Sequence, residues 1–431
     1  MNPVNRRAFL KAIAAASSAS VLTIPARAHA GVKARVVVIG GGFGGATAAK
    51  YIKLMDSAID VTLIEANQTY TACPLSNEVI SGHREIESLQ TGYDKIARRG
   101  VNVVHDFVTA VDPLKKTVAT QGGRKLSYDA LIMAPGISFD YTAVAGYSED
   151  AVTDMPHAYK AGEQTRILKW QLQAMADGGV FIISVPPKPF RCPPGPYERA
   201  AQVAHYCLHN GKARSKVLIL DANDSFSKKG LFEQGWKALY PGMIEWVPGA
   251  GDGKVERVDV ASRTCFTGLN EHQGDVVNLI PPHHAGQIAV RSGLANAQGW
   301  CEVTPMTMES TRHKDIYPIG DACIAGELPV YDMPKSAHMA MTQAKVAAGA
   351  IVAKLNGLPV PQPYYVNTCY STLAPDWGIS VVHIYRVENN QFVYVKTAGG
   401  ISPLDAPPLQ RKLEAEYCVG WFNNVMADAF A

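Results

Sequence analysis

The chain has 431 residues, of which 47% are hydrophobic and 18% are charged, as expected for a globular protein of two or three domains. Four of its 41 basic residues lie in the first 30 positions, and removing them leaves 37 basic against 38 acidic residues. This balance argues against a nucleic-acid partner. After residue 30 no segment is long and apolar enough to predict a membrane span.

Residues 1–30 have the pattern of a twin-arginine export signal. Arg6 and Arg7 precede an apolar stretch rich in alanine and serine, and Ala28-His29-Ala30 fits the small-x-small cleavage rule. A short basic anchor is the alternative interpretation. Because twin-arginine export carries folded proteins, it suits a chain that receives a cofactor before export. The sequence therefore predicts a periplasmic protein.

The first predicted element is a buried strand over 35–39, followed by a glycine-rich turn and a helix of small residues. The turn has the spacing G-x-G-x-x-G, with glycines at Gly40, Gly42 and Gly45. A second strand over 60–64 ends in Glu65, about 20 residues further on, where the acid that binds a ribose hydroxyl is expected. The register predicts a dinucleotide-binding unit in which the pyrophosphate lies at the helix N-terminus. The alternative is a glycine-rich turn in an ordinary α/β fold.

The segments that follow run back toward the predicted cofactor. A polar loop over 67–78 contains Cys73, which is a candidate to meet the flavin or nicotinamide end of a dinucleotide, although a loop cysteine is more often structural. An apolar strand over 130–134 leads into a turn at Gly136. This pattern is familiar from flavoproteins with two dinucleotide-binding domains, in which the turn passes near the cofactor.

Residues 151–268 predict a second Rossmann-like domain. Helices are expected over 166–176 and 197–208, and strands over 179–185 and 216–220. The place of the glycine fingerprint is taken by the proline-rich loop 186–196. Proline removes the N–H donors that hold a pyrophosphate, so this domain is predicted not to bind NAD(P)H.

One cysteine of this loop, Cys192, lies just before a predicted helix N-terminus. The helix dipole and two nearby cations, Arg191 and Arg199, predict a stabilised thiolate at this position. Glu198 lies in the same turn and is a candidate proton acceptor, although a glutamate at a helix start is commonly only a capping charge.

The first domain is expected to resume at residue 269, so the predicted FAD-binding domain comprises residues 31–150 and 269–360. A short strand over 316–319 ends in Gly320 and Asp321, which matches the second FAD fingerprint, with Asp321 on the ribityl chain. A helix is predicted over 334–353. Its N-terminus is placed to stabilise negative charge on a reduced flavin, and Lys335 is assigned to the same site.

Residues 361–431 predict a third, α+β unit that forms an interface and covers the flavin. Strands are expected over 378–385 and 392–395, and a helix over 409–422 that carries Trp421. None of the cysteines lies in a C-x-x-C-H motif, so no haem is expected on this chain. The His and Cys spacings predict no metal site.

Several stretches together resemble the flavin-binding subunit of flavocytochrome c sulfide dehydrogenase. They are VVVIGGGFGGATAAKYIKL, VTLIEANQTYTACPLSNEVI, FRCPPGPYERA, IGDACIA and NTCYSTLAPDWGISV. The resemblance extends from about residue 31 to the end of the chain. It implies the fold class of the glutathione-reductase-like flavoproteins, together with sulfide:quinone oxidoreductases: two Rossmann-like α/β domains and a C-terminal interface domain.

The resemblance also implies the chemistry. Cys73 would join FAD through an 8α thioether, and Cys192 and Cys369 would form a redox-active disulfide that hydrosulfide opens. Electrons would pass through FAD to haem c on a separate cytochrome subunit of a heterodimer. Glu198 is the candidate base, and Trp421 is a candidate flavin contact. The remaining cysteines are expected to be structural or buried; they are Cys207, Cys265, Cys301, Cys323 and Cys418.

Three alternatives stay open. A sulfide:quinone oxidoreductase usually has an amphipathic C-terminal anchor, whereas residues 423–431 are short and weakly apolar. An NADH dehydrogenase conflicts with the proline-rich loop. A non-catalytic sulfur-carrier or assembly subunit that keeps FAD as a structural element would not need cysteines at all three motif positions.

Overall fold

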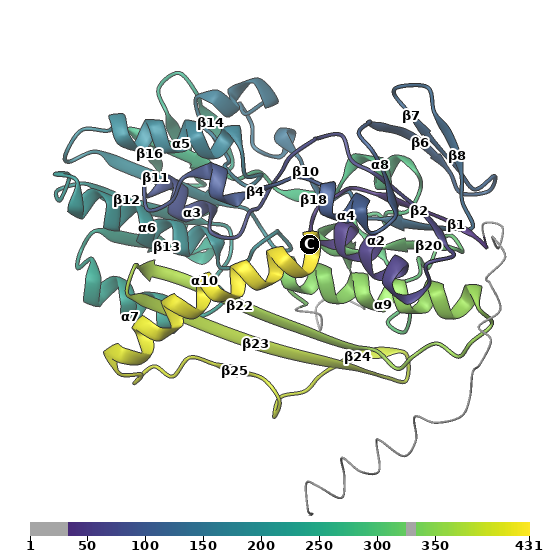
Figure 1. The fold of residues 1–431 in the computed structure, drawn as a ribbon. Coiled ribbons are helices and arrows are strands. Elements are labelled where there is room, and N and C mark those ends of the chain that lie inside the picture. The colour runs from purple at the N-terminus through teal and green to yellow at the C-terminus, as the bar shows by residue number, and fades with distance from the viewer. Residues whose placement is uncertain (1–32, 325–332) are drawn as a thin grey trace, which may run out of the picture.

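A computed structural model describes residues 33–324 and 333–431. The predicted export signal, residues 1–30, lies outside the described residues. The described chain forms two α/β units side by side, with the C-terminal unit packed along both (Figure 1).

The first unit is a five-stranded parallel sheet whose strand order is β20-β9-β1-β2-β5. These strands are β1 (Arg35–Ile39), β2 (Asp60–Ile64), β5 (Val101–Val104), β9 (Ala130–Met133) and β20 (Ile316–Pro318). The central strands are buried on both faces, as their apolar sequences predict. Two helices, α2 (Phe43–Met55) and α9 (Ala337–Leu355), cover one face, and their alanines allow close contact. A small antiparallel sheet extends this unit: β6 (Val108–Asp112), β7 (Thr117–Thr120) and β8 (Lys125–Ser127).

The second unit is a four-stranded parallel sheet of order β13-β12-β11-β17. Its strands are β11 (Val180–Val185), β12 (Lys216–Asp221), β13 (Ile244–Val247) and β17 (Val276–Leu279). Its helices are α5 (Glu163–Ala174), α6 (Gly195–His209) and α7 (Lys229–Leu239). A small antiparallel sheet precedes β17 and consists of β14 (Arg257–Asp259), β15 (Thr264–Phe266) and β16 (Glu271–Gln273).

The predicted boundary between residues 268 and 269 is wrong. Strand β17 pairs in parallel with β11, with Val276 opposite Phe181, so the chain stays in the second sheet through Leu279. An apolar run of four residues fits the interior of either parallel sheet, and its periodicity does not tell which. The chain returns to the first unit through β18 (His283–Ala285), which pairs with β10 (Ile137–Phe139).

The C-terminal unit consists of a long antiparallel hairpin covered by a helix. The hairpin strands are β22 (Tyr364–Ala374) and β23 (Trp377–Glu388), with β24 (Gln391–Tyr394) and β25 (Gly400–Ile401) beside β23. Helix α10 (Pro408–Phe430) continues eight residues beyond the predicted end at Phe422. The additional turns are stabilised by a contact with the first unit, because Phe430 stacks on Tyr70 with 5.1 Å between ring centroids.

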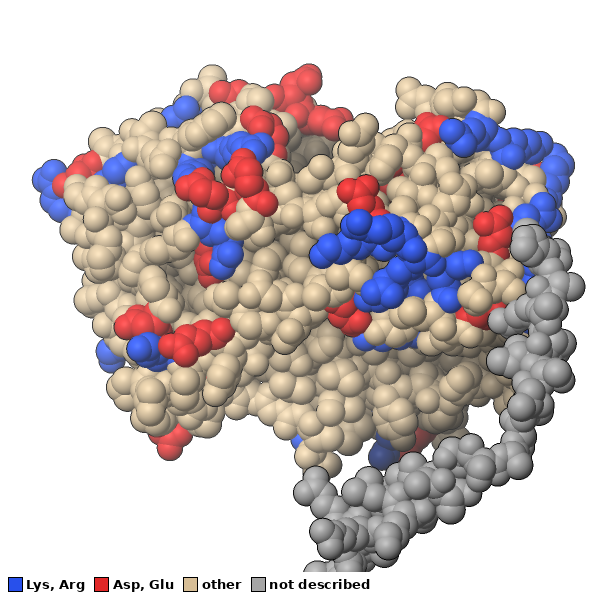
Figure 2. Space-filling model, in the orientation of Figure 1, with Lys and Arg blue, Asp and Glu red and all other residues tan. Residues whose placement is uncertain are grey.

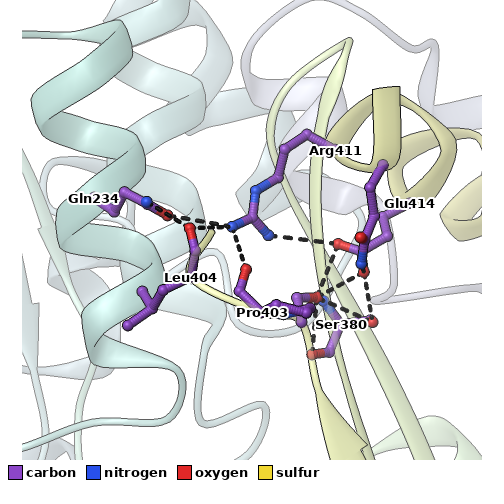
Figure 3. A network of polar contacts seen from close by, with 8 residues as sticks. Gln234, Ser380, Pro403, Leu404, Arg411 and Glu414 are labelled. Carbon is purple, nitrogen blue, oxygen red and sulfur yellow. Dashed lines mark hydrogen bonds and ion pairs between the residues drawn. The ribbon is translucent and has the colours of Figure 1, made fainter. Parts of the chain in front are cut away.

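The start of α10 is held by a buried arginine. Arg411 is 1% exposed, and its Nη2 donates to the carbonyl oxygens of Pro403 and Leu404 and to Oε1 of Gln234 on α7 (Figure 3). Its Nη1 lies 3.7 Å from Glu414 Oε2, which is an ion pair without a hydrogen bond. These contacts connect α10 to the second unit.

Short elements complete the described fold. They are β3 (Tyr70–Thr71), α3 (Ser76–Ile80), β4 (Gln90–Thr91), α4 (Asp94–Arg98), α8 (Gln287–Arg291), β19 (Cys301–Glu302) and β21 (Cys323–Ile324). Figure 2 shows acidic and basic side chains interspersed over this face, with one larger basic group in the region of α2 and α4. The mixture reflects the near balance of charge in the sequence.

Candidate active site

The glycine turn after β1 has the geometry that the spacing predicts. Gly40 has a φ of +92°, and a Cβ there would overlap the carbonyl oxygen of Ala134. A Cβ on Gly45 would overlap the carbonyl oxygen of Gly40. Gly42 forms the extended N-cap of α2 and provides no side-chain cap, so N–H groups at this helix end remain available to an anion.

Glu65 lies against this turn. Its Oε2 accepts the N–H of Gly41 at 2.7 Å, and its Oε1 accepts the N–H of Asn67 at 2.9 Å. A carboxylate has further lone pairs, so it can still accept a ribose hydroxyl. The position predicted for the ribose-binding acid therefore coincides with the end of β2 next to the phosphate-binding turn.

Arg191 connects the predicted flavin residues. Its Nε donates to Asp321 Oδ2 at 2.6 Å, and its Nη1 lies 3.7 Å from the Cys73 sulfur. Gly136, with a φ of +68°, passes so close that a Cβ would lie 3.1 Å from Nη2 of Arg191. Cys73, Gly136 and Asp321 thus converge on the guanidinium of Arg191. The sequence predicts this arginine only as a cation near Cys192.

The residues of this region fit FAD. Asp321 Oδ1 is buried and has no hydrogen-bond partner in the described part of the chain. A buried carboxylate oxygen without a donor is costly, and a ribityl hydroxyl would satisfy it. Together with the glycine turn and the open N-terminus of α2, this orphaned oxygen is the structural evidence for a flavin dinucleotide site.

Lys335 precedes α9 and is 8% exposed. Its Nζ donates to the carbonyl oxygens of Asp321 and Cys323 and lies 3.8 Å from the centre of the Trp300 ring. Burial lowers its pKa. The carbonyl oxygen of Lys335 accepts the N–H of Cys192 at 2.9 Å, so the loop that carries Cys192 is fixed to the start of α9.

The second predicted cysteine, Cys369, reaches the same place from β22. The preceding residue, Thr368, donates its N–H to His338 Nδ1 on α9 at 2.9 Å. Cys192 has a φ of +52°, an uncommon backbone conformation for a residue with a side chain. Both sulfurs are unbonded in the structure, so the disulfide between them stays a prediction.

Glu198 joins the elements that carry the two cysteines. Its Oε1 accepts the N–H of Thr372 on β22 at 2.8 Å, and its Oε2 accepts Nδ2 of Asn77 on α3 at 3.0 Å. Burial raises its pKa, against the opposing effect of these hydrogen bonds. Glu198 is therefore more than a capping charge, because it connects α6 to α3 and to β22. Its partner on β22, Thr372, lies three positions after Cys369.

The predicted stabilised thiolate at Cys192 is wrong for this structure, in which Cys192 and Cys369 are both free thiols. Burial raises the pKa of Cys192 well above its ordinary value. The two arginines are engaged elsewhere: Arg191 pairs with Asp321, and Arg199 donates to Asn77, Asn278 and two carbonyl oxygens. Sequence proximity placed these cations near the cysteine but could not give their partners.

Side chains of the protein itself occupy the crevice at the carboxyl end of the second sheet. Asp221, which ends β12, accepts the Tyr197 hydroxyl at 2.6 Å and the indole N–H of Trp246 at 2.9 Å. The Tyr197 ring stacks on Phe226 with 3.6 Å between centroids. In open α/β sheets this strand end is where a dinucleotide ribose binds, and here its acid and surrounding space are occupied by aromatic side chains.

Three family descriptions match consecutive parts of the chain. Residues 165–281 match the central domain of the sulfide dehydrogenase [flavocytochrome c] flavoprotein chain, and residues 361–430 match its flavin-binding domain. Residues 34–168 match the pyridine nucleotide-disulphide oxidoreductase family. The chain is a flavoprotein of the flavocytochrome c sulfide dehydrogenase and sulfide:quinone oxidoreductase type.

Two individual relatives carry names of this type, and a third is named a probable ferredoxin reductase. The chain is 56% identical over 45 residues to the sulfide dehydrogenase [flavocytochrome c] flavoprotein chain of Chlorobaculum thiosulfatiphilum, which is 10% of this chain and 94% of that sequence. It is 24% identical over 301 residues to the mitochondrial sulfide:quinone oxidoreductase of Mus musculus, which is 66% of this chain and 65% of that one. It is also 35% identical over 348 residues to the probable ferredoxin reductase CtmF of Castellaniella defragrans, covering 76% and 77% of the two chains.

The fold is likewise similar to a solved member of this group. The sulfide:quinone oxidoreductase of Aquifex aeolicus superposes with a TM-score of 0.73 over 92% of this chain and 91% of that one, at 16% identity. At this identity the likeness shows the fold alone. The predicted fold class, two Rossmann-like domains and a C-terminal unit, is confirmed for this flavoprotein.

The predicted flavin contact Trp421 lies on α10. The indole N–H of Trp421 is buried without a hydrogen-bond partner among the described residues, and the ring lies 6.1 Å from that of Tyr370, the residue after Cys369.

The five remaining cysteines are all buried, as expected: Cys207, Cys265, Cys301, Cys323 and Cys418. Cys418 on α10 is not remote from the site, because the charges of Glu198 and Cys369 both act on its pKa.

Sequence reasoning missed one charged residue of this site, Lys228. It lies at the N-cap of α7, is 6% exposed, and donates from Nζ to Ser371 Oγ on β22 at 2.8 Å. Its charge opposes the effect of burial on the pKa of Cys369. The sequence around it, SKKGLF, has no motif that distinguishes it from a surface lysine.

Proposed function

We propose that this chain is the flavoprotein subunit of a sulfide dehydrogenase. It oxidises sulfide through a Cys192–Cys369 disulfide next to FAD and passes the electrons to a c-type cytochrome subunit. The coarser part, membership in the sulfide-oxidising flavoproteins, rests on the family matches. The observation that supports the disulfide chemistry is the convergence of both cysteines on α9 and Glu198, beside the Asp321 site.

In this proposal the glycine turn, Glu65, Asp321 and Lys335 hold FAD, and Cys73 attaches it as a thioether. The flavin supplies a carrier that accepts an electron pair and releases single electrons. Support for the attachment point comes from the position of Cys73, which lies 3.7 Å from the guanidinium that also binds Asp321.

The chain's own residues carry the sulfur chemistry. Hydrosulfide attacks one sulfur of the disulfide, so that one S–S bond forms while another breaks and the second cysteine leaves as a thiolate. Glu198 accepts the proton when hydrogen sulfide enters as the neutral molecule. Its buried position supports this role, because burial raises its pKa toward the range in which proton transfer is useful. A second hydrosulfide then bonds to the outer sulfur and leaves with it as persulfide or polysulfide, while Cys192 is released as a thiolate. The electron pair given up when the two thiolates re-form the disulfide is the one that FAD would accept.

A sulfide:quinone oxidoreductase is the second candidate, favoured by the relatives and the solved structure that carry that name. Within residues 33–324 and 333–431 no helix combines the length and hydropathy needed to cross a membrane. We propose export to the periplasm and a cytochrome acceptor, because the predicted signal and the absence of a C-x-x-C-H motif suit a chain that gives electrons to a haem partner.

The acceptor decides between the two candidates. The protein is purified from the periplasm, any associated c-type cytochrome is identified, and sulfide-dependent reduction of cytochrome c and of a short-chain quinone is compared. A copurifying cytochrome and faster cytochrome reduction are expected. Quinone reduction without a cytochrome partner would favour the second candidate, and absence of any sulfide-dependent reduction would overturn both.

A further inference from the structure

A buried cation lies on the same face of β22 as Cys369. Successive side chains of a strand alternate between faces, so Cys369 and Ser371 point the same way, about 7 Å apart along the strand. The pairing of β22 with β23 is regular here, with Cys369 opposite Val381 and Ser371 opposite Ile379. The ammonium of Lys228 donates to Ser371 Oγ at 2.8 Å, which anchors it on the face of β22 that carries Cys369.

The placement of Lys228 is costly to the fold. The residue has a φ of 62° although it is not glycine, and its side chain is 6% exposed. Its ammonium forms no ion pair in the part of the chain that the structure describes, and its contacts there are the hydrogen bond to Ser371 Oγ and the Phe232 ring, whose centroid lies 5.8 Å away. A buried ammonium without a carboxylate partner is rare and costly, and a negative charge that forms beside it would offset this cost.

The charge of Lys228 affects the pKa of four ionisable groups. They are Glu198 on α6, Cys192 before α6, Cys369 on β22 and Cys418 on α10. The only carboxyl group among them is Glu198, whose oxygens already accept hydrogen bonds from Thr372 and Asn77. After burial, the ammonium is the largest influence on the pKa of Cys369, whereas at Cys192 the charges of Cys369 and Glu198 come before it.

We propose that Lys228 is a positioning residue that makes Cys369 the leaving thiolate when the Cys192–Cys369 disulfide opens. This inference rests on the proposed function. Hydrosulfide forms a new S–S bond to Cys192, the Cys192–Cys369 bond breaks, and its electron pair stays on the Cys369 sulfur beside the ammonium. The hydrosulfide proton remains with the persulfide until a base removes it, and no further oxidant is needed.

Alkylation of the reduced holoprotein tests this assignment. Iodoacetamide is added briefly at a series of pH values, and the modified peptides of Cys192 and Cys369 are quantified by mass spectrometry. In the wild type we expect Cys369 to reach half of its maximal rate at a lower pH than Cys192. Lys228→Met should raise the Cys369 half-point by about one to two pH units and shift Cys192 less, because an opposite charge at this range favours the thiolate.

Two matched variants separate charge from structure. Lys228→Arg keeps the cation and should retain the low Cys369 half-point, whereas Ser371→Ala keeps the ammonium but releases its anchor and should give a smaller shift than Lys228→Met. Flavin content and melting temperature report on folding. In a folded Lys228→Met variant, an unchanged pH dependence of Cys369 alkylation would overturn the proposal. If Lys228→Met does not fold, the wild type alone decides: the proposal is overturned when Cys192 reaches half of its maximal alkylation rate at the same pH as Cys369 or at a lower one.

The disulfide itself is tested in the same protein before reduction. A linked Cys192–Cys369 peptide in the oxidised sample supports the proposed function whatever Lys228 does. Absence of that peptide from the oxidised sample would overturn the proposed mechanism, and with it the leaving-group assignment. A linked peptide with unaltered alkylation in Lys228→Met would overturn the assignment alone.

Discussion

Replacing Arg411 by methionine should destabilise the chain by about 3–5 kcal/mol, the usual cost of removing one member of a buried charged pair. Methionine keeps the length of the apolar stem but removes the guanidinium, which is 1% exposed. The lost contacts are those of Nη2 with the carbonyl oxygen of Pro403 at 2.7 Å, with that of Leu404 at 3.3 Å and with Gln234 Oε1 at 3.2 Å.

The magnitude follows from these contacts. One nitrogen with two hydrogens cannot satisfy three acceptors fully, so they amount to about two hydrogen bonds from a charged donor, each worth about 1.5–3 kcal/mol. The 3.7 Å ion pair with Glu414 adds less, and Glu414 keeps two 2.8 Å contacts with the Ser402 hydroxyl after the substitution. The sum lies in the range expected for a buried pair.

Urea denaturation followed by circular dichroism measures the effect, and Gln234→Ala is the matched control. Gln234 supplies the 3.2 Å contact and donates its Nε2 to the carbonyl oxygen of Leu404 at 2.7 Å, so its removal should cost about 1–2 kcal/mol, less than that of Arg411. Arg411→Lys should lie between the two because it keeps a charge but not the fork. An Arg411→Met variant as stable as the Gln234→Ala variant would refute the reasoning that this network fixes α10.

Four further predictions concern the site. Cys73→Ala should release FAD into the supernatant after acid denaturation, whereas the wild type should keep a yellow polypeptide; equal release from both would remove the thioether. Glu198→Gln should slow flavin reduction by sulfide by about 10²–10⁴-fold and abolish the acid limb of its pH profile, because a base with a raised pKa loses activity as the pH falls through that value. Gly40→Ala should yield protein without FAD, whereas Gly349→Ala on α9, which has open space, should bind it normally. NADH should not reduce the flavin, because Asp221 is occupied by Tyr197 and Trp246; reduction by NADH would show that this crevice opens.

The parts of the fold that the sequence predicts are those fixed by local chemistry. The turn at Gly40 and Gly45 can be predicted because only glycine fits those backbone positions. The strand that ends in Gly320-Asp321 can be predicted in the same way, because its pattern lies within a few consecutive residues. The proline-rich loop likewise predicts a second Rossmann-like unit without a dinucleotide fingerprint, since proline lacks the necessary donor.

Features that depend on distant partners could not be predicted. The run Val276–Leu279 suits either parallel sheet, and only its pairing with β11 shows which one it joins. The last turns of α10 look weakly apolar, yet they are held by the contact of Phe430 with Tyr70, some 360 residues away in sequence. Lys228 and Arg191 belong to the site through tertiary contacts with Ser371 and Asp321, which no local pattern signals.

The central claim is that sulfide is oxidised through a disulfide between Cys192 and Cys369 at the flavin. The most direct test is peptide mapping of the purified holoprotein under non-reducing conditions, before and after anaerobic addition of sulfide, with flavin absorbance recorded in parallel. We predict a linked Cys192–Cys369 peptide that is lost as the flavin is reduced, and no sulfide-dependent reduction in Cys369→Ser. Two alkylatable thiols in the oxidised protein, together with normal flavin reduction by sulfide, would contradict the account.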